Sequence, residues 1–193
     1  MKKWFLAAIF LILILIAPFY FGLRCGSSPG LQPRQPARVT KEAPAPQPPP
    51  PPPPGPLTLA AVGDVMLARK VDTLMQSQGV GYPMAKLGST LKAASLTFGN
   101  LESPLATTGK QIPGKGIWFR ARPEAIQALK DGGFDIMNIA NNHILDYDTP
   151  AFLETMDLLE KAGIKYCGGG RDIDQARQPA ILEVKGTRLG FLG

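Results

Sequence analysis

Histidine and cysteine are scarce in this chain of 193 residues, which contains one histidine and two cysteines. Two cysteines are too few for the disulfide framework that stabilises many small secreted domains, and Cys25 and Cys167 do not form an obvious pair. The chain also has no CxxC pair, the pattern that would specify a structural zinc site. The sequence therefore excludes a cysteine framework, and we expect Cys167 to be a small buried residue.

Acidic residues are almost missing from the first 56 positions, where six basic residues accompany the single acid Glu42. Removing these from the totals of 21 basic and 15 acidic residues leaves 15 basic and 14 acidic residues after Pro56. Five of the six net positive charges therefore lie in the first 56 residues, around a hydrophobic segment, and they cover no folded face. We expect no nucleic-acid partner.

Charge is absent from residues 4–23, whose sequence is WFLAAIFLILILIAPFYFGL. Twenty helical residues at 1.5 Å each span the roughly 30 Å hydrocarbon core of a bilayer, so we predict a membrane anchor over residues 1–23. The alternative is a cleaved signal peptide, but its apolar core is usually about 7–15 residues long and ends at small residues. Here the run is longer and ends in bulky aromatic residues. A lipoprotein signal would use Cys25, and Arg24 occupies the position where such signals have a small residue.

The flanks of this segment predict its orientation. Lys2 and Lys3 precede it in a very short tail, which places the N-terminus in the cytoplasm and the rest of the chain outside, as a single-pass membrane protein. Arg24, on the far side, is a weak signal for the opposite orientation.

Residues 24–56 hold thirteen of the twenty prolines and almost no large apolar side chains. Such a segment buries too little surface to fold, and the run Pro48 to Pro54 favours an extended polyproline II spacer. A PxxP ligand for SH3-like domains is the alternative, and it would require a cytosolic partner. We predict a linker.

Residues 57–193 alternate between apolar runs and helical stretches, which favours an α/β sheet with helices on its faces. We expect strands at 57–62, 95–98, 134–140 and 164–166, helices at 68–78, 123–132 and 149–163, and a hairpin of strands 180–184 and 188–192. The last strand pattern breaks off at Gly193, which favours a fragment or an early-terminated gene model.

Three of these apolar runs end in polar clusters. The carboxyl ends of strands meet at one edge of an open α/β sheet, so we expect these clusters to lie together. Their oxygen ligands and one imidazole suit a divalent ion such as Mn, Mg, Fe or Zn, with the histidine moving a proton. The clusters are Gly63-Asp64, Asn100-Leu101-Glu102, and Asn141-Asn142-His143 with Asp146 close behind.

A purely structural interpretation of the same residues stays open. Asp64 can cap the following helix, Asn100 can satisfy a turn, and the two adjacent asparagines can adopt left-handed turn conformations. A single histidine is also a common hydrogen-bonded structural residue.

Four motifs in residues 57–193 resemble the CapA-type capsule-synthesis family associated with poly-γ-glutamate. They are AVGDVML at 61–67, FGNLESPL at 98–105, WFRARPEAIQALKDGGFDIMNIANNHILDYD at 118–148, and TMDLLEKAGI leading to GGGRDIDQARQP at 155–179. They occur in order and cover essentially the whole of this part of the chain.

The resemblance implies a layered α/β sandwich related to the calcineurin-like metallophosphatases, with a site along one sheet edge. It implies that Asp64 is the first metal-binding aspartate and that Asn100 and Glu102 form the second motif. It also implies that Asn142 binds metal and that His143 assists the leaving group.

Three departures from these patterns affect that site. Met66 stands where a metallophosphatase has histidine, Asp148 stands where the family commonly has glycine, and the later histidine motifs would lie past Gly193. We therefore expect this chain to lack ligands for a two-metal centre.

Arg120 and Arg122 flank Ala121 and could grip a phosphate or a polyglutamate carboxylate, or could form surface salt bridges. Two functions remain open. One is a membrane-anchored, extracytoplasmic role in synthesis, export or anchoring of poly-γ-glutamate or a similar polymer, with membrane synthase subunits as partners. The other is a metal-dependent hydrolase of phosphoester or amide bonds, and it remains undecided whether the chain is an enzyme.

Overall fold

The structure is a computed structural model that describes residues 55–193. The predicted anchor at 4–23 and nearly all of the predicted linker at 24–56 lie outside these residues. Within residues 55–193, none of the helices combines the length and the apolar character required to cross a bilayer.

Four parallel strands form the central sheet in the order β1-β2-β3-β4. The strands are β1 (Leu59–Val65), β2 (Leu96–Leu101), β3 (Ile136–Asn138) and β4 (Lys165–Cys167). Since sequence neighbours are also neighbours in the sheet, each of the first three strands is followed by a crossover that leads to the next. The predicted α/β class is therefore confirmed, and the relation to metallophosphatases stays a prediction.

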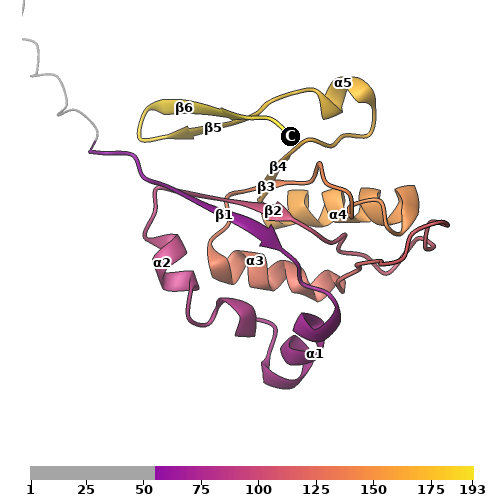
Figure 1. Cartoon of the computed structure of the whole chain (residues 1–193). Coiled ribbons are helices and arrows are strands. Elements are labelled where there is room, and N and C mark those ends of the chain that lie inside the picture. The colour runs from indigo at the N-terminus through magenta and orange to yellow at the C-terminus, as the bar shows by residue number, and fades with distance from the viewer. Residues whose placement is uncertain (1–54) are drawn as a thin grey trace, which may run out of the picture. The chain divides into compact units, whose positions relative to one another are not determined.

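Helical segments fill the crossovers between these strands. They are α1 (Arg69–Gln78), the 3-10 helix η1 (Tyr82–Met84) and α2 (Gly88–Lys92) after β1; the 3-10 helix η2 (Pro123–Ala125) and α3 (Ile126–Gly132) after β2; and α4 (Asp148–Ala162) after β3. A short helix, α5 (Ile173–Ala176), and an antiparallel hairpin of β5 (Ala180–Val184) and β6 (Thr187–Phe191) follow β4. Figure 1 shows the hairpin above the sheet and α1, α2 and α3 below it.

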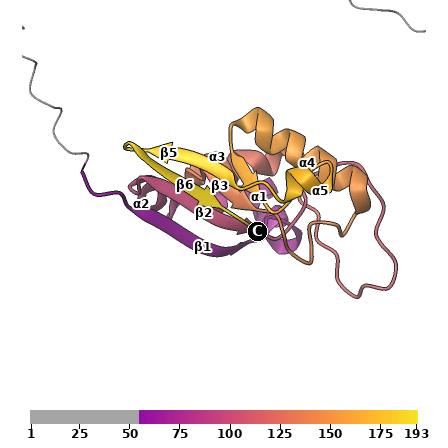
Figure 2. The ribbon, with the colours of Figure 1, turned by 90° about the horizontal axis from the view of Figure 1, so that it is seen from above.

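The core lies between the sheet and its helices. Leu129 of α3 and Met156 and Leu159 of α4 are fully buried against the side chains of Met137 and Ile139 from β3 and the residue that follows it. Central strand β2 is buried on both faces, which explains its continuous apolar run. Figure 2, seen from above, shows the hairpin lying across β2 and β3.

An irregularity interrupts the pairing of β1 with β2. Ala61 pairs with Phe98, and Asp64 pairs with Asn100, so β1 uses one more residue than β2 over this interval. Such a bulge changes which side of the sheet the following side chains face. As a result, Gly63 and Asp64 are both exposed, and Val65 points into the core.

Residues 106–121 form a long excursion without helix or strand, which we call the Ω-loop. Its ends lie together, because Ala106 N–H donates to Ala121 O (3.1 Å) and Ala121 N–H donates to Pro104 O (2.9 Å). The loop leaves the domain beyond the carboxyl ends of β1 and β2, at the right of Figure 1. Loops of this kind are packed by their own side chains and often carry function.

Several boundaries differ from the expected ones. Strand β3 covers only Ile136–Asn138 of the expected 134–140, because Phe134 N–H still bonds to Leu129 O at the end of α3. The short helices η1, α2 and α5 were not expected. They contain three to five residues, too few for a helical period to be visible in sequence.

Candidate functional site

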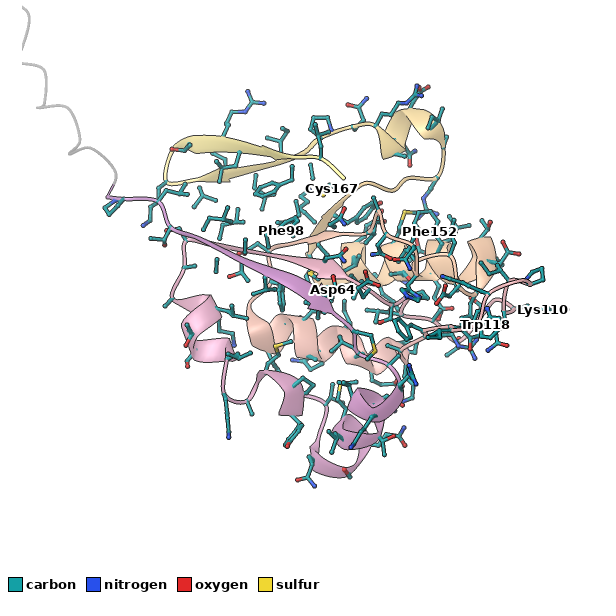
Figure 3. All side chains as sticks on the ribbon, viewed as in Figure 1. Asp64, Phe98, Lys110, Trp118, Phe152 and Cys167 are labelled. Carbon is teal, nitrogen blue, oxygen red and sulfur yellow. The ribbon has the colours of Figure 1, made fainter. Side chains whose placement is uncertain are left out.

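Four of the predicted site residues lie together at the carboxyl edge of the sheet. Asn100 Nδ2 donates to Asp64 Oδ1 (2.9 Å) and to Glu102 Oε1 (3.0 Å), so one amide links the two carboxylates. Glu102 Oε2 is 4.0 Å from His143 Nε2. Three consecutive contacts therefore connect Asp64 with His143, and Figure 3 shows Asp64 where β1 ends.

Asn100 is held in this orientation by two further amides. Its Oδ1 accepts hydrogen bonds from Asn138 Nδ2 (2.8 Å) and Asn141 Nδ2 (3.1 Å). Asn141 also donates to Leu101 O (2.8 Å). Because the oxygen of Asn100 faces two donors, its nitrogen is the atom that faces the carboxylates. Asn138 was not singled out from the sequence.

His143 is oriented by a buried carboxylate. Its Nδ1 is 2.7 Å from Asp146 Oδ2, and Asp146 is fully buried. The ring also stacks on Phe119 of the Ω-loop, with 4.0 Å between ring centroids. These contacts fix the ring so that Nε2 is directed toward Glu102. A histidine held in this way is suited to accept or donate a proton at Nε2.

Asp146 connects the histidine to the Ω-loop. Its carboxylate accepts hydrogen bonds from the Lys115 ammonium and from Phe119 N–H (2.6 Å). Burial acts to raise the pKa of Asp146, but the hydrogen bonds from Lys115, His143 and Phe119 outweigh it and lower the pKa below its usual value. Asp146 therefore stays ionised, and Lys115 is a residue that the sequence analysis did not identify.

Of the two adjacent asparagines, only Asn141 has a side chain that is hydrogen-bonded within the described network. Asn141 Oδ1 accepts from His143 N–H and Ile144 N–H, both at 3.0 Å, which closes a local turn. Asn142 is exposed, and its backbone carbonyl accepts from Lys115. Within residues 55–193 the Asn142 side chain makes no hydrogen bond, so the metal-binding role predicted for it stays a prediction.

The two predicted substrate arginines have different surroundings. Arg122 forms a salt bridge with Asp72 of α1 (2.8 Å) and approaches Glu124 (3.7 Å). Arg120 is exposed, lies 4.0 Å above the Tyr147 ring and donates to the Thr108 carbonyl (3.3 Å). Only Arg120 of this pair lacks a carboxylate partner in the described part of the chain.

The side chains as they lie do not fit a metal ion. Among residues 55–193, no three His, Cys, Asp or Glu side chains converge on a common point that could hold one. The group between the Asp64 and Glu102 carboxylates is the Asn100 amide nitrogen, a hydrogen-bond donor, where a cation would require an oxygen or an imidazole nitrogen. At this edge of the sheet, hydrogen bonds through the Asn100 amide therefore link Asp64 to Glu102.

A pocket of about 510 Å³ adjoins the loop that carries Asn141. Its walls are mainly apolar and include Ile139, Phe152 and Ile173, while Asp64, Glu102 and His143 do not line it. The ionisable side chains of the sheet edge therefore lie outside this apolar pocket.

Comparison with known proteins places this chain in a family. The model of the family described as "Bacterial capsule synthesis protein PGA_cap" matches residues 58–193. The chain belongs to the PGA_cap family. The resemblance inferred from the four motifs is thereby confirmed.

Named relatives agree with this assignment. The chain is 31% identical over 140 residues to "Capsule biosynthesis protein CapA" of Bacillus anthracis, covering 71% of this chain and 34% of that protein. It is 27% identical over 140 residues to "PGA biosynthesis protein CapA" of Bacillus subtilis (71% and 37%). A "Probable polyglutamine synthesis accessory protein" of Mycobacterium tuberculosis is 31% identical over 113 residues (58% and 29%). The chain thus spans about a third of the length of the curated relatives it matches.

Proposed function

We propose that this PGA_cap chain works outside the cell, tethered by residues 4–23, in the synthesis, export or anchoring of an anionic polymer of the poly-γ-glutamate type. The names of the relatives support the polymer class. The Ω-loop and the sheet edge would hold the polymer, and membrane synthase subunits would supply it.

The charge of the Ω-loop region is the observation that carries this proposal. Residues 103–123 contain four basic residues and no acid. Lys110 and Arg120 are exposed, and neither has a carboxylate partner among the described residues. Figure 3 shows Lys110 near the tip of the projecting segment. Exposed cations on an anchored loop provide the charge that binds a polycarboxylate.

Binding of poly-γ-glutamate to the whole purified chain in detergent tests the proposal. We expect saturable binding that weakens with salt, and we expect the double variant K110A/R120A to lose about tenfold or more in affinity. Lys86→Ala, an exposed lysine between η1 and α2, is the matched control and should bind like the wild type. Equal binding by the double variant, or no binding by the wild type, would contradict the proposal.

The proposed topology has its own test. A protease added to intact cells should cut within residues 24–56 and release the folded part. Protection from the protease, with cutting only after lysis, would place the domain inside the cell.

A second candidate function is hydrolysis of a phosphoester or amide bond, and the His143–Asp146 pair favours it. Asp146 bonds to Nδ1, so the Nε2 atom facing Glu102 is the one that would exchange a proton with a substrate or a water. The divalent ion predicted from the sequence stays a prediction that elemental analysis of the purified chain tests. Hydrolysis that His143→Ala and Asp146→Ala both abolish would support the enzyme. Polymer binding with no hydrolysis would support the assembly role.

A further inference from the structure

Arg69 lies at the same edge of the sheet as His143 but takes no part in the hydrogen-bond network. It follows the end of β1 and is the first residue of α1. Its guanidinium carbon is 5.8 Å from the centroid of the Phe119 ring, and that ring stacks on His143 with 4.0 Å between centroids. Arg69 and His143 are thus two polar groups in contact with one aromatic side chain.

Among the described residues, no carboxylate neutralises the charge of Arg69. The side chain is exposed, and among residues 55–193 it has neither a salt bridge nor a side-chain hydrogen bond. Arg122 and Arg171 differ, since each forms a salt bridge with an aspartate. A guanidinium held over an aromatic ring keeps its hydrogen-bond donors free for a ligand.

The backbone at Arg69 is also unusual. Its φ of 55° lies in the left-handed region, which residues with a Cβ rarely adopt. Only Asp148 and Lys185 share a positive φ among the non-glycine residues of the described chain. Strained backbone of this kind is concentrated at functional positions. Here it accompanies an arginine at the point where β1 turns into α1.

We propose that Arg69 binds a carboxylate of the polymer and holds it against the Phe119–His143 stack. This inference rests on the proposed polymer function and extends it. The Ω-loop cations contact the polymer along its length, whereas Arg69 places one carboxylate beside His143. Arginine suits this task because its planar donors bind a carboxylate in a bidentate manner.

The single histidine of the chain permits a direct test. Carbethoxylation by diethyl pyrocarbonate, followed by absorbance at 240 nm in a preparation without a histidine tag, reports on His143 alone. We expect poly-γ-glutamate to slow modification of His143 about fivefold or more in the wild type. A short probe, γ-linked triglutamate, should do the same at higher concentration, since it needs only the Arg69 position.

The decisive variant is Arg69→Gly. Glycine adopts a φ of 55° without strain, so this variant should fold with an unchanged or higher Tm. We expect it to lose the protection of His143 by both probes and to bind triglutamate at least about tenfold more weakly. Lys70→Ala removes the same charge from the next exposed residue and should behave like the wild type.

The outcomes separate this inference from the function on which it rests. Wild-type binding of poly-γ-glutamate with undiminished protection in Arg69→Gly would overturn the role of Arg69 and leave the polymer function standing. A wild type that binds neither probe would overturn both. Loss of protection in Arg69→Gly together with its retention in Lys70→Ala would support the inference, and Arg69→Lys should keep only part of the protection because an ammonium cannot bind a carboxylate in a bidentate manner.

Discussion

The Ω-loop and the β5–β6 hairpin both lie at the surface of the domain, and they are held there in different ways. The Ω-loop has no helix or strand, yet Lys115 and Phe119 bond to the buried Asp146, and Ile112 N–H bonds to the Asp146 carbonyl (3.1 Å). The hairpin has a regular ladder of five residue pairs, and none of its strand residues is buried.

An aromatic stack attaches the hairpin to the sheet, and a lysine attaches it to the segment that precedes β1. Phe191 stacks on Phe98 of β2 with 5.6 Å between ring centroids, and Lys185 Nζ donates to Pro56 O (2.9 Å). Figure 3 shows Phe98 below the hairpin. Regular secondary structure and attachment to the core are therefore separate properties, since the irregular Ω-loop has the buried polar anchor.

Asp146→Ala should have the largest effect, because it removes the acceptor shared by Lys115, Phe119 N–H and His143. We expect a loss of about 3 kcal/mol in the free energy of unfolding, measured by urea denaturation. Asp174→Ala, at an exposed residue of α5, should change it by less than about 0.5 kcal/mol. A small effect of Asp146→Ala would show that the Ω-loop is held by other contacts.

Gly109→Ala tests the close approach of the Ω-loop to α4. Gly109 has a φ of 84°, and a Cβ there would overlap the Tyr147 carbonyl. We expect destabilisation of about 2 kcal/mol or more. Gly114→Ala is the matched control, because Gly114 has a φ of 77° in the same loop but open space around it. Equal destabilisation by the two variants would mean that backbone strain alone matters.

Phe191→Ala tests the hairpin. Removing one ring of the stack should cost about 1 kcal/mol. Amide hydrogen exchange should accelerate in β5 and β6 and stay unchanged in the Ω-loop, because no Ω-loop anchor involves the hairpin. Faster exchange around His143 in this variant would show that the two regions are coupled.

Glu154→Gln should have the smallest effect and a pH dependence. Burial acts to raise the pKa of Glu154, but hydrogen bonds from Thr107 and Thr108 lower it below its usual value of 4.5. The carboxylate therefore contributes stability above about pH 4.5, and this contribution is lost as the pH falls through the lower folded pKa. The side chain is partly exposed, so we expect less than about 1 kcal/mol. The Tm difference from wild type should be present at pH 7 and shrink below pH 4; a difference independent of pH would exclude the charge as its cause.

The sequence could predict the meeting of Asp64, Asn100, Glu102 and His143 because parallel strands bring their carboxyl ends to one edge. The resemblance selected Asn142, whereas Asn141 is the one that joins the network, and no local signal separates two identical side chains in adjacent positions. Only the turn in which Asn141 Oδ1 accepts two backbone N–H groups decides which amide faces Asn100.

Lys115 and Asn138 are two residues of the network that could not be predicted from the sequence. Lys115 lies in a segment without periodicity, and its contact with Asp146 spans 31 positions of the chain. Asn138 lies within the apolar run 134–140 and is the last residue of β3, but its bond to Asn100 spans 38 positions. Local patterns carry no information about such partners. The expectation that Cys167 is a small buried residue, by contrast, is confirmed, and Cys167 is the last residue of β4.

The extra residue in β1 determines which side chains at the end of this strand face outward and which face the core. If the side chains of β1 alternated strictly, Asp64 would face the helices and Val65 would face outward. The one extra residue reverses the orientation of both side chains. The number of residues in β1 therefore decides which face of the sheet carries the Asp64 carboxylate. Deleting Gly63, which nothing crowds, would restore strict alternation and still leave Asp64 outward and Val65 inward, whereas deleting a second residue would exchange a charge for a core side chain at this end of the strand.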